Sequence, residues 1–214
     1  MTPKGWAQVE LGEVAEFING RGFKPHEWSD KGLPIIRIQN LNGSPEFNYF
    51  EGEYNSKIEV NSGELLFAWS GSRGTSFGPH VWNGPKAVLN YHTWRVVPVS
   101  NDVDKRFLFD VLKQLTARIE GEAHGAAALV HTQKNRIVRY SIKLPPLPEQ
   151  QKIAAILSTW DRAIELTEKL VAAKQTRKLG LMQQLFSAKL RLSGFEKTIW
   201  KSSSRNQKIG RAHV

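Results

Sequence analysis

The clearest pattern of hydrophobic positions lies in the last third of the chain, where apolar residues recur at alternating steps of four and three over residues 147–193. This spacing is that of a coiled-coil seam. The positions of the seam are Ile153, Leu157, Trp160, Ile164, Thr167, Val171, Lys174, Lys178, Leu181, Leu185, Ala188 and Leu192. A helix of roughly 40 residues would be roughly 60 Å long, which exceeds an ordinary core helix. We therefore predict a helix that needs a partner helix; the alternative is an amphipathic helix that lies on its own domain.

A proline-rich segment, Leu-Pro-Pro-Leu-Pro-Glu-Gln-Gln at residues 144–151, stands at the start of this helix. Proline fixes its own φ and pushes the preceding residue out of the α region, so Leu144, Pro145 and Leu147 are predicted to be extended. Pro148 suits a first helical turn because its missing N–H costs nothing there. The helix is therefore predicted to begin at about Pro148, and the segment marks the boundary between two kinds of structure.

The first 143 residues alternate short apolar runs with turn residues, which is typical of a mixed domain in which strands dominate. Strands are predicted at 33–38, 65–69, 87–89 and 94–97. Helices are predicted at 11–17 and 105–120, and the apolar face of the second is formed by Phe107, Leu108, Val111, Leu112, Leu115 and Ile119. The predicted fold class is α+β, with a strand-rich mixed globular domain at 1–146, one long coiled-coil-forming helix at 147–193 and a tail at 194–214.

Composition narrows the class of protein. A chain of 214 residues that is 40% hydrophobic can bury one good core, which favours one or two domains. No run of 18 apolar residues predicts a membrane span and the N-terminus has no signal-peptide pattern, so we expect a cytoplasmic protein without a membrane partner. The absence of cysteine excludes disulfides, thiolate zinc sites and cysteine catalysis.

The formal net charge of +10 is divided unevenly along the chain. Residues 1–147 carry 17 Lys and Arg against 15 Asp and Glu, a net of +2, whereas residues 148–214 carry 13 against 5, a net of +8. A basic chain favours a polyanionic partner, because each neutralised phosphate releases counterions. The alternative is that these charges form solvated faces.

Several segments resemble a known family. The junction at 144–151, the run Lys-Ile-Ala-Ala-Ile-Leu at 152–157 with Asp161, and Leu-Met-Gln-Gln-Leu-Phe at 181–186 resemble the conserved region of type I restriction-modification specificity subunits. The target recognition domain of that family is similar to four upstream segments: Gly-Trp at 5–6, Leu-Gly-Glu-Val at 11–14, Pro-Ile-Ile-Arg-Ile at 34–38 and Gly-Glu-Leu-Leu-Phe-Ala-Trp-Ser-Gly-Ser at 63–72. Together the segments extend over about residues 5–195.

The resemblance implies a division of labour among subunits. Subunits of this family have a recognition domain, a helix, a second recognition domain and a second helix antiparallel to the first, and this chain resembles the first half. Residues 1–146 would read half of a bipartite target in double-stranded DNA, and the helix would dock modification (methyltransferase) subunits. The expected helix–helix or subunit contacts are Ile153, Leu157, Trp160, Ile164, Val171, Leu181 and Leu185. The chain itself would be non-catalytic and without a cofactor, while S-adenosylmethionine is expected on the modification subunit, and ATP and magnesium on the restriction and motor subunit.

The tail supports two interpretations. Gly-Phe-Glu at 194–196 with Trp200 resembles the opening of a second recognition domain, but the following residues do not continue it. Residues 209–214 match what a common sequencing-adapter oligonucleotide encodes in one frame, which indicates a reading frame that ran off a DNA fragment. The alternative is a natural half subunit that dimerises, for which a second copy of the chain is the candidate partner.

The loops of the first domain hold the side chains that DNA reading needs. Arg pairs with guanine, and Asn or Gln with adenine, in bidentate fashion in the major groove. The candidate DNA-binding residues are Arg21, Lys24, Arg37, Gln39, Asn40, Asn42, Ser70, Ser72, Arg73, Thr75 and His92, with Lys134 and Arg136 as candidates for phosphate contacts. The alternative for each of them is an ordinary solvated loop residue.

Signatures of catalysis and of metal binding are weak. The glycine-rich segment 71–78 lacks the Gly-Lys-Ser/Thr ending of a P-loop, the histidines lack metal-ligand spacing, and no Asn-Pro-Pro-Tyr methyltransferase motif occurs. We therefore predict neither catalytic residues nor a metal. The alternative function is a non-DNA interaction module that binds protein or glycan and dimerises through its coiled coil. A steep loss of binding with salt would favour DNA over sugar.

Overall fold

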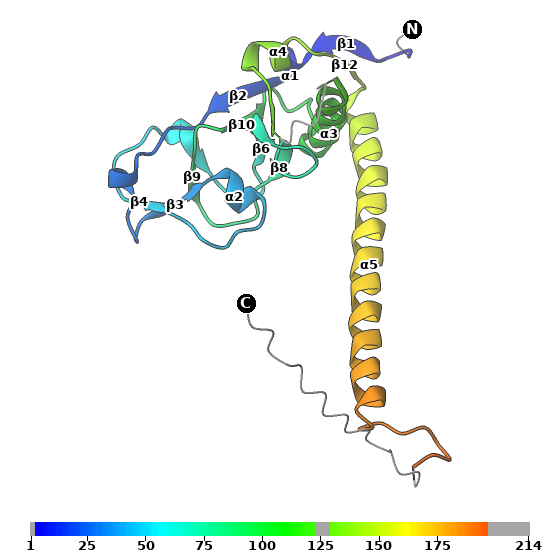
Figure 1. Ribbon diagram of the computed structural model, residues 1–214. Coiled ribbons are helices and arrows are strands. Elements are labelled where there is room, and N and C mark those ends of the chain that lie inside the picture. The colour runs from blue at the N-terminus through cyan, green and yellow to red at the C-terminus, as the bar shows by residue number, and fades with distance from the viewer. Residues whose placement is uncertain (1–2, 123–128, 197–214) are drawn as a thin grey trace, which may run out of the picture. The chain divides into compact units, whose positions relative to one another are not determined.

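The structure, a computed structural model, describes residues 3–122 and 129–196 and divides into two compact units, Met1–Ser158 and Thr159–Val214 (Figure 1). The first unit contains the strands β1 (Ala7–Glu10), β2 (Ala15–Asn19), β3 (Leu33–Ile36), β4 (Tyr49–Phe50), β5 (Glu59–Val60), β6 (Leu65–Ala68), β7 (Ser70–Ser72), β8 (Gly78–Val81), β9 (Ala87–Leu89), β10 (Thr93–Pro98), β11 (Leu129–His131) and β12 (Ser141–Leu144). Its helices are α1 (Leu11–Val14), α2 (Ile38–Leu41), α3 (Lys105–Glu122) and α4 (Lys134–Val138), with 3₁₀ turns at Pro25–Glu27 and Ser56–Ile58. The long helix α5 (Leu147–Phe186) begins in this unit and continues into the second.

Strand β6 is the centre of the first unit because it is buried on both faces. It pairs with β10 on one side and β8 on the other, in a four-stranded sheet of order β2-β10-β6-β8. Successive side chains of a strand point to opposite faces. Leu65 and Phe67 therefore belong to the core that includes α3, whereas Leu66 belongs to a second core. One strand thus joins two hydrophobic cores.

The second core is covered by another four-stranded sheet, of order β4-β3-β9-β5. Its central pair, β3 and β9, is parallel, with Ile35 opposite Val88 and Ile36 opposite Leu89. All four of these side chains are buried. A short run of consecutive apolar residues is what a strand buried on both faces requires.

Helix α3 confirms the sequence prediction for 105–120. Phe107, Leu108, Leu112, Leu115 and Ile119 are buried on one side of it. The carboxylate of Asp104 accepts the backbone N–H of Phe107 at 2.8 Å, which satisfies a donor of the first turn. The acid before the helix therefore serves as a cap.

The proline junction is held by a polar contact at the start of α5. Leu144 is extended and pairs with Ala7 of β1, as predicted. Leu147 is helical, so the prediction that it is extended was wrong; α5 begins one residue before Pro148. Gln150 is buried, and its amide group donates to the carbonyls of Asp102 and Pro145, both at 2.9 Å, while its oxygen accepts the N–H of Asp104 at 2.9 Å. The side chain of Gln150 in α5 therefore binds the segment that leads into α3.

Other predicted boundaries were wrong. The strand predicted at 33–38 ends at Ile36, and Ile38 is the first residue of α2. The helix predicted at 11–17 ends at Val14, because residues from Ala15 onward pair with β10 in strand β2. The long helix ends at Phe186 instead of 193, since Ala188 adopts a positive φ of 59° and turns the chain. Ala188 and Leu192 therefore lie outside the helical seam. The predicted tail, 194–214, falls outside the described residues from 197 onward.

The fold class is α+β with one long C-terminal helix, as predicted. Among the described residues, the helices include none with an apolar stretch sufficient to cross a membrane.

Candidate nucleic-acid interface

Hydrogen bonds of Trp69 link three segments of the first unit: its own, the turn between β9 and β10, and the segment that contains Thr132. The backbone N–H of Trp69 donates to the carbonyl of His92 at 3.2 Å, and its indole Nε1 donates to the carbonyl of Tyr91 at 2.8 Å. The carbonyl of Trp69 accepts the N–H of Thr132 at 2.9 Å. Because Asn90 also holds the N–H of Tyr91 at 2.8 Å, the backbone of the turn is fixed on both sides of Tyr91.

A hollow of about 290 Å³, the polar hollow, is lined in part by Asn90, Tyr91 and His92 of this turn. Three candidate residues line it: Arg37 directly after β3, Gln39 in α2, and His92. The guanidinium of Arg37 donates to the side chain of Asn48 at 2.6 Å and lies 5.2 Å above the ring of Trp28. The structure therefore brings together donors and acceptors that are distant in sequence.

A second hollow, of about 400 Å³, the aromatic hollow, shares Tyr91 of this turn with the polar hollow. It is lined by Asn19, Gly20, Trp69, Tyr91, Trp94, Thr132, Gln133 and Lys134. Tyr91 lines both hollows and is 47% exposed. The Lys134 ammonium, a predicted phosphate ligand, donates to the carbonyl of Phe17 in β2.

Gly20 allows the neighbouring loop to approach this turn. A Cβ at Gly20 would lie 2.1 Å from the carbonyl oxygen of Asn90, and the N–H of Arg21 donates to Leu89 at 2.9 Å. Gly20 is therefore required for the close packing of two backbones.

Arg21 and Lys24 lie on a loop that Glu27 organises. The carboxylate of Glu27 forms an ion pair with Arg21 and accepts the backbone N–H of Lys24 at 2.8 Å. These contacts, first the Lys24 N–H and then the charge of Arg21, lower the pKa of Glu27. Arg21 also lies 4.9 Å above the rings of Phe23 and Phe50, which positions it at the edge of the second core.

Partial burial lowers the pKa of His92 below its ordinary value. A neutral imidazole has one donor and one acceptor nitrogen, so His92 can offer both to a ligand at neutral pH. Its ring lies 3.8 Å from that of Tyr91, between centroids. His92 thereby combines a polar edge with an aromatic support.

The candidate residues at 70–75 form a separate, tightly bonded turn. The Ser72 N–H donates to the hydroxyl of Ser76 at 2.8 Å, and the Gly74 N–H donates to Glu120 of α3 at 2.8 Å. Ser70 pairs with His131 through β7 and β11. Arg73 and Thr75 are exposed on this turn, outside the linings of both hollows.

Two candidates have roles within the fold. Asn40 is buried; its oxygen accepts the Arg37 N–H at 3.0 Å, and its amide group donates to the carbonyls of Ser44 and Glu46. We therefore correct the prediction for Asn40, whose polar atoms are committed to the α2 turn. Arg136 forms an ion pair with Glu122 at 2.6 Å. Asn42 lies exposed at the end of α2.

Sequence reasoning did not select Tyr91, which lines both hollows, or three further residues that line the aromatic hollow. Tyr91, Trp69, Trp94 and Thr132 were not candidates for DNA binding. Their only signal was an excess of aromatic residues near polar loops, which fits a core equally well. The pairing of β7 with β11 brings Thr132 to Trp69, and that long-range contact has no local pattern.

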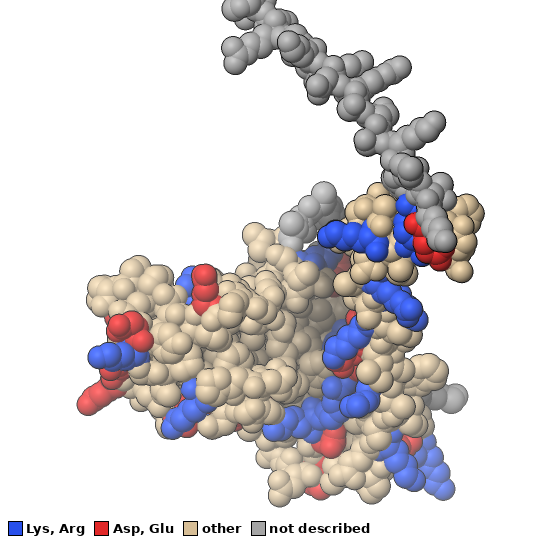
Figure 2. All heavy atoms as spheres, turned by 90° about the horizontal axis from the view of Figure 1, so that it is seen from below, with Lys and Arg blue, Asp and Glu red and all other residues tan. Residues whose placement is uncertain are grey.

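On the face drawn in Figure 2, Lys and Arg side chains lie interspersed with Asp and Glu. This agrees with the net charge of only +2 over residues 1–147. Selective contacts would therefore depend on the two hollows more than on a general positive field.

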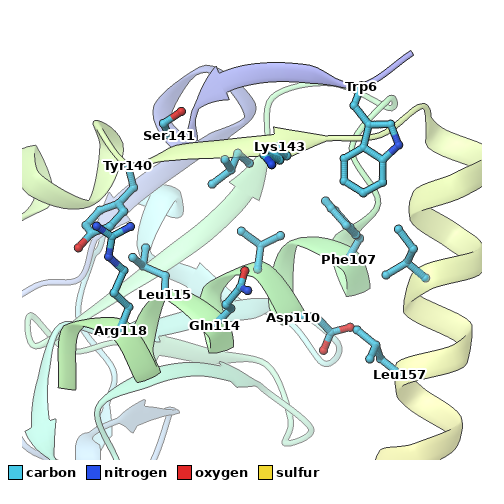
Figure 3. A pocket seen from close by; sticks show the side chains of 13 residues that line it. Trp6, Phe107, Asp110, Gln114, Leu115, Arg118, Tyr140, Ser141, Lys143 and Leu157 are labelled. Atoms are coloured by element: carbon cyan, nitrogen blue, oxygen red, sulfur yellow. The ribbon is translucent and has the colours of Figure 1, made fainter. Parts of the chain in front are cut away.

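A third hollow, of about 810 Å³, lies where α5 leaves the first unit. Figure 3 shows Trp6 beside β1, Phe107 and Asp110 from α3, and Leu157 from α5 around it. The indole of Trp6 donates to Glu149 of α5 at 3.1 Å. Ile153 and Leu157, the first two seam positions, both line this third hollow, which is called the groove below.

The rest of the seam is exposed. Trp160 is 67% exposed and Ile164 is 55% exposed. Val171 and Leu181 are likewise exposed, and Leu185 is half-buried. Such a row of large apolar side chains marks an interaction surface.

The structure defines a class of protein that combines a strand-rich α+β unit with one long helix whose apolar residues are largely exposed. The chain belongs to the family of type I restriction modification DNA specificity domains, whose sequence profile matches residues 3–173.

Individual relatives support this assignment. The chain is 27% identical over 189 residues to the type I restriction enzyme MjaVIII specificity subunit of Methanocaldococcus jannaschii, which covers 86% of this chain and 43% of that protein. It is 24% identical over 165 residues to the EcoBI specificity subunit of Escherichia coli, covering 76% of this chain and 34% of that protein. The crystal structure of the HsdS subunit from Thermoanaerobacter tengcongensis has the same fold, with a TM-score of 0.61, 21% identity, and coverage of 78% of this chain and 40% of that one. The chain thus spans less than half the length of these relatives.

Proposed function

We propose that this chain recognises DNA sequence as part of a type I restriction-modification complex and reads one half of a bipartite target. The observation that carries the proposal is the match of residues 3–173 to the DNA specificity domain family. The polar hollow supports it, because Arg37, Gln39 and His92 there offer the donors and acceptors that distinguish base pairs in the major groove. Lys134 and Lys24 are suited to backbone phosphates, which position a protein without specifying sequence.

Selection from a randomised duplex library tests this proposal. The wild-type chain should enrich one short motif, and its affinity should fall steeply as salt rises. Gln39→Ala should relax one position of the motif, a loss of about 1–3 kcal/mol of discrimination. Gln8→Ala, at an exposed glutamine on β1, is the matched control and should leave the motif unchanged. Binding that ignores both sequence and salt would contradict the proposal and favour a protein- or glycan-binding module.

The seam on α5 is the proposed docking surface for a second, antiparallel helix and for the partner subunits. An antiparallel helix, from a second half of the protein or from a second copy, would cover Ile153, Leu157, Trp160 and Ile164 and begin in the groove of Figure 3. Modification subunits would dock on the same helix and carry S-adenosylmethionine, while a restriction and motor subunit would carry ATP and magnesium. This chain contributes recognition and no catalytic group.

A substitution on the seam separates docking from folding. Ile164→Glu should abolish co-purification with the modification subunit, because a charge would have to be buried in an apolar interface. Thr176→Glu, about 160° around the helix from the nearest seam positions, Lys174 and Lys178, should preserve it. Equal retention of the partner by both variants would place docking elsewhere.

A further inference from the structure

The aromatic hollow has a geometry that base-edge reading in an intact duplex does not require. The rings of Phe67, Trp94 and Trp69 follow one another nearly parallel, with centroid separations of 5.8 and 6.1 Å and interplanar angles of 19° and 23°. Phe67 and Trp94 are buried, whereas Trp69 is half-buried and lines the hollow. The row of rings thus ends at an open cavity.

The rim of the hollow carries groups that match the edge of a nucleobase. Asn19 and Gln133 are exposed carboxamides from two different segments of the lining, β2 and the residue before α4, and each has both a donor and an acceptor. Tyr91 supplies an exposed aromatic face on a backbone that is hydrogen-bonded on both sides. The ammonium of Lys134 adds a positive charge to the same lining.

We infer that this hollow binds a nucleobase that has left the base stack. Stacking on aromatic side chains accepts any base through its π face, and carboxamides add hydrogen bonds to the base edge. A volume of about 400 Å³ accommodates one base with part of its sugar, and the aromatic side chains of its lining offer apolar surface to the unstacked base. Removing a base from the stack costs least where that base is unpaired. This inference rests on the proposed DNA binding and extends it from reading edges to holding a base.

Three duplexes with identical flanking sequence test the inference without knowledge of the target. One is fully paired, one carries a single unpaired nucleotide, and one carries an abasic nucleotide at that same place. The wild-type chain should bind the unpaired base on the order of tenfold more tightly than the abasic duplex, from the stacking of one base. Each of the four bases should be used in turn.

Variants locate the effect. Tyr91→Ala should reduce the advantage of the unpaired base to within about twofold, because a stacking face is lost. Gln133→Ala should reduce it for some bases more than others, since it removes an edge contact. Val99→Ala, at an exposed apolar residue outside the hollow, is the control and should retain the full advantage.

The outcomes separate this inference from the proposed function. Equal affinity of the wild type for all three duplexes would overturn the inference and leave DNA recognition standing. An advantage that survives both Tyr91→Ala and Gln133→Ala would overturn it as well, because the base would bind elsewhere. Absence of binding to every duplex would overturn the proposed function and the inference together. Displacement of the unpaired-base duplex by a neutral oligosaccharide would assign the hollow to sugar.

Discussion

The first unit buries large apolar side chains in its own cores, whereas the second part of α5 leaves its large apolar side chains exposed. In the first unit, β6 is buried on both faces and joins two cores. Between residues 159 and 196, every described residue is exposed or half-buried, although Trp160, Ile164, Leu166 and Leu170 are large and apolar. The first unit therefore contains the interactions that stabilise it, whereas this part of the helix carries an exposed apolar surface, the one proposed above for docking.

The largest difference is expected between a core residue and a seam residue. Phe67→Ala should lower the free energy of unfolding by about 3–5 kcal/mol, because Phe67 is fully buried between other aromatic rings. Ile164→Ala should change it by no more than about 0.5 kcal/mol in the isolated chain, as for an exposed site. Urea unfolding followed by tryptophan fluorescence measures both. Comparable losses for the two variants would mean that the seam is already buried in solution.

The next largest effect is expected where the helix meets the first unit. Gln150→Leu should destabilise by about 1–3 kcal/mol, because the Asp104 N–H and two carbonyls would lose a buried partner. Gln151→Leu is the matched control at the exposed neighbour. Thermal unfolding of the two variants, compared with that of the wild type, gives the difference. If Gln150→Leu and Gln151→Leu unfold alike, the glutamine does not fasten the helix.

Acid should destabilise the first unit through His80. Burial lowers the pKa of His80, and the hydrogen bond to the Ser76 carbonyl opposes this only in part. Below the ordinary pKa of about 6.5, the unfolded chain then binds more protons than the folded chain, so stability falls as pH falls until the folded pKa is passed. His80→Gln should flatten this dependence of stability on pH between about pH 7.5 and 5.5. A smaller dependence should remain in the variant, because the pKa of His92 is also lowered. Urea midpoints at several pH values within that window report the slope, and a slope identical to that of the wild type would contradict the assignment.

The smallest effect is expected from a buried hydroxyl. The side chain of Thr93 is fully buried and its Oγ1 has no hydrogen-bond partner among the described residues. Thr93→Val should leave stability unchanged or raise it by up to about 1 kcal/mol, since an unsatisfied polar atom is replaced by a methyl group of similar shape. Thr116→Val is the contrasting variant, because the Thr116 hydroxyl donates to Leu112 at 2.9 Å. A loss on Thr93→Val as large as that on Thr116→Val would reveal a partner for the Thr93 hydroxyl.

Sequence patterns predicted the elements whose apolar pattern is local. The face of α3 has a helical period, the strands at 65–69 and 87–89 are short apolar runs between turn residues, and α5 shows its seam period over most of its length. The segment 11–17 failed because pairing of Ala15–Asn19 with β10 outweighs its local preference. The end of α5 failed because the seam pattern continues past the residue, Ala188, at which the backbone turns.

The candidate site was predicted less well than the fold, for a physical reason. The search for polar side chains that can bind base edges selected Arg37, Gln39 and His92, which the structure places in the lining of one hollow. The same rule selected Asn40, whose amide instead supports its own turn. The rule did not select Tyr91, which is neither an amide nor a basic residue. Tyr91 lines both hollows, and its turn is held by contacts of Trp69 with distant segments. Composition identifies polar loops, and only the tertiary contacts determine which of their side chains meet.

The most direct test of sequence recognition is the methylated-base map of DNA from cells that express this chain with its modification subunit. The account predicts an interrupted adenine-methylation motif in which Gln39→Ala changes one element and Gln8→Ala changes none. A symmetric motif would mean that two copies pair through α5, and an asymmetric one that a second recognition domain supplies the other half. A motif that is identical for wild type and for Gln39→Ala, or no methylation although the modification subunit co-purifies, would contradict the account.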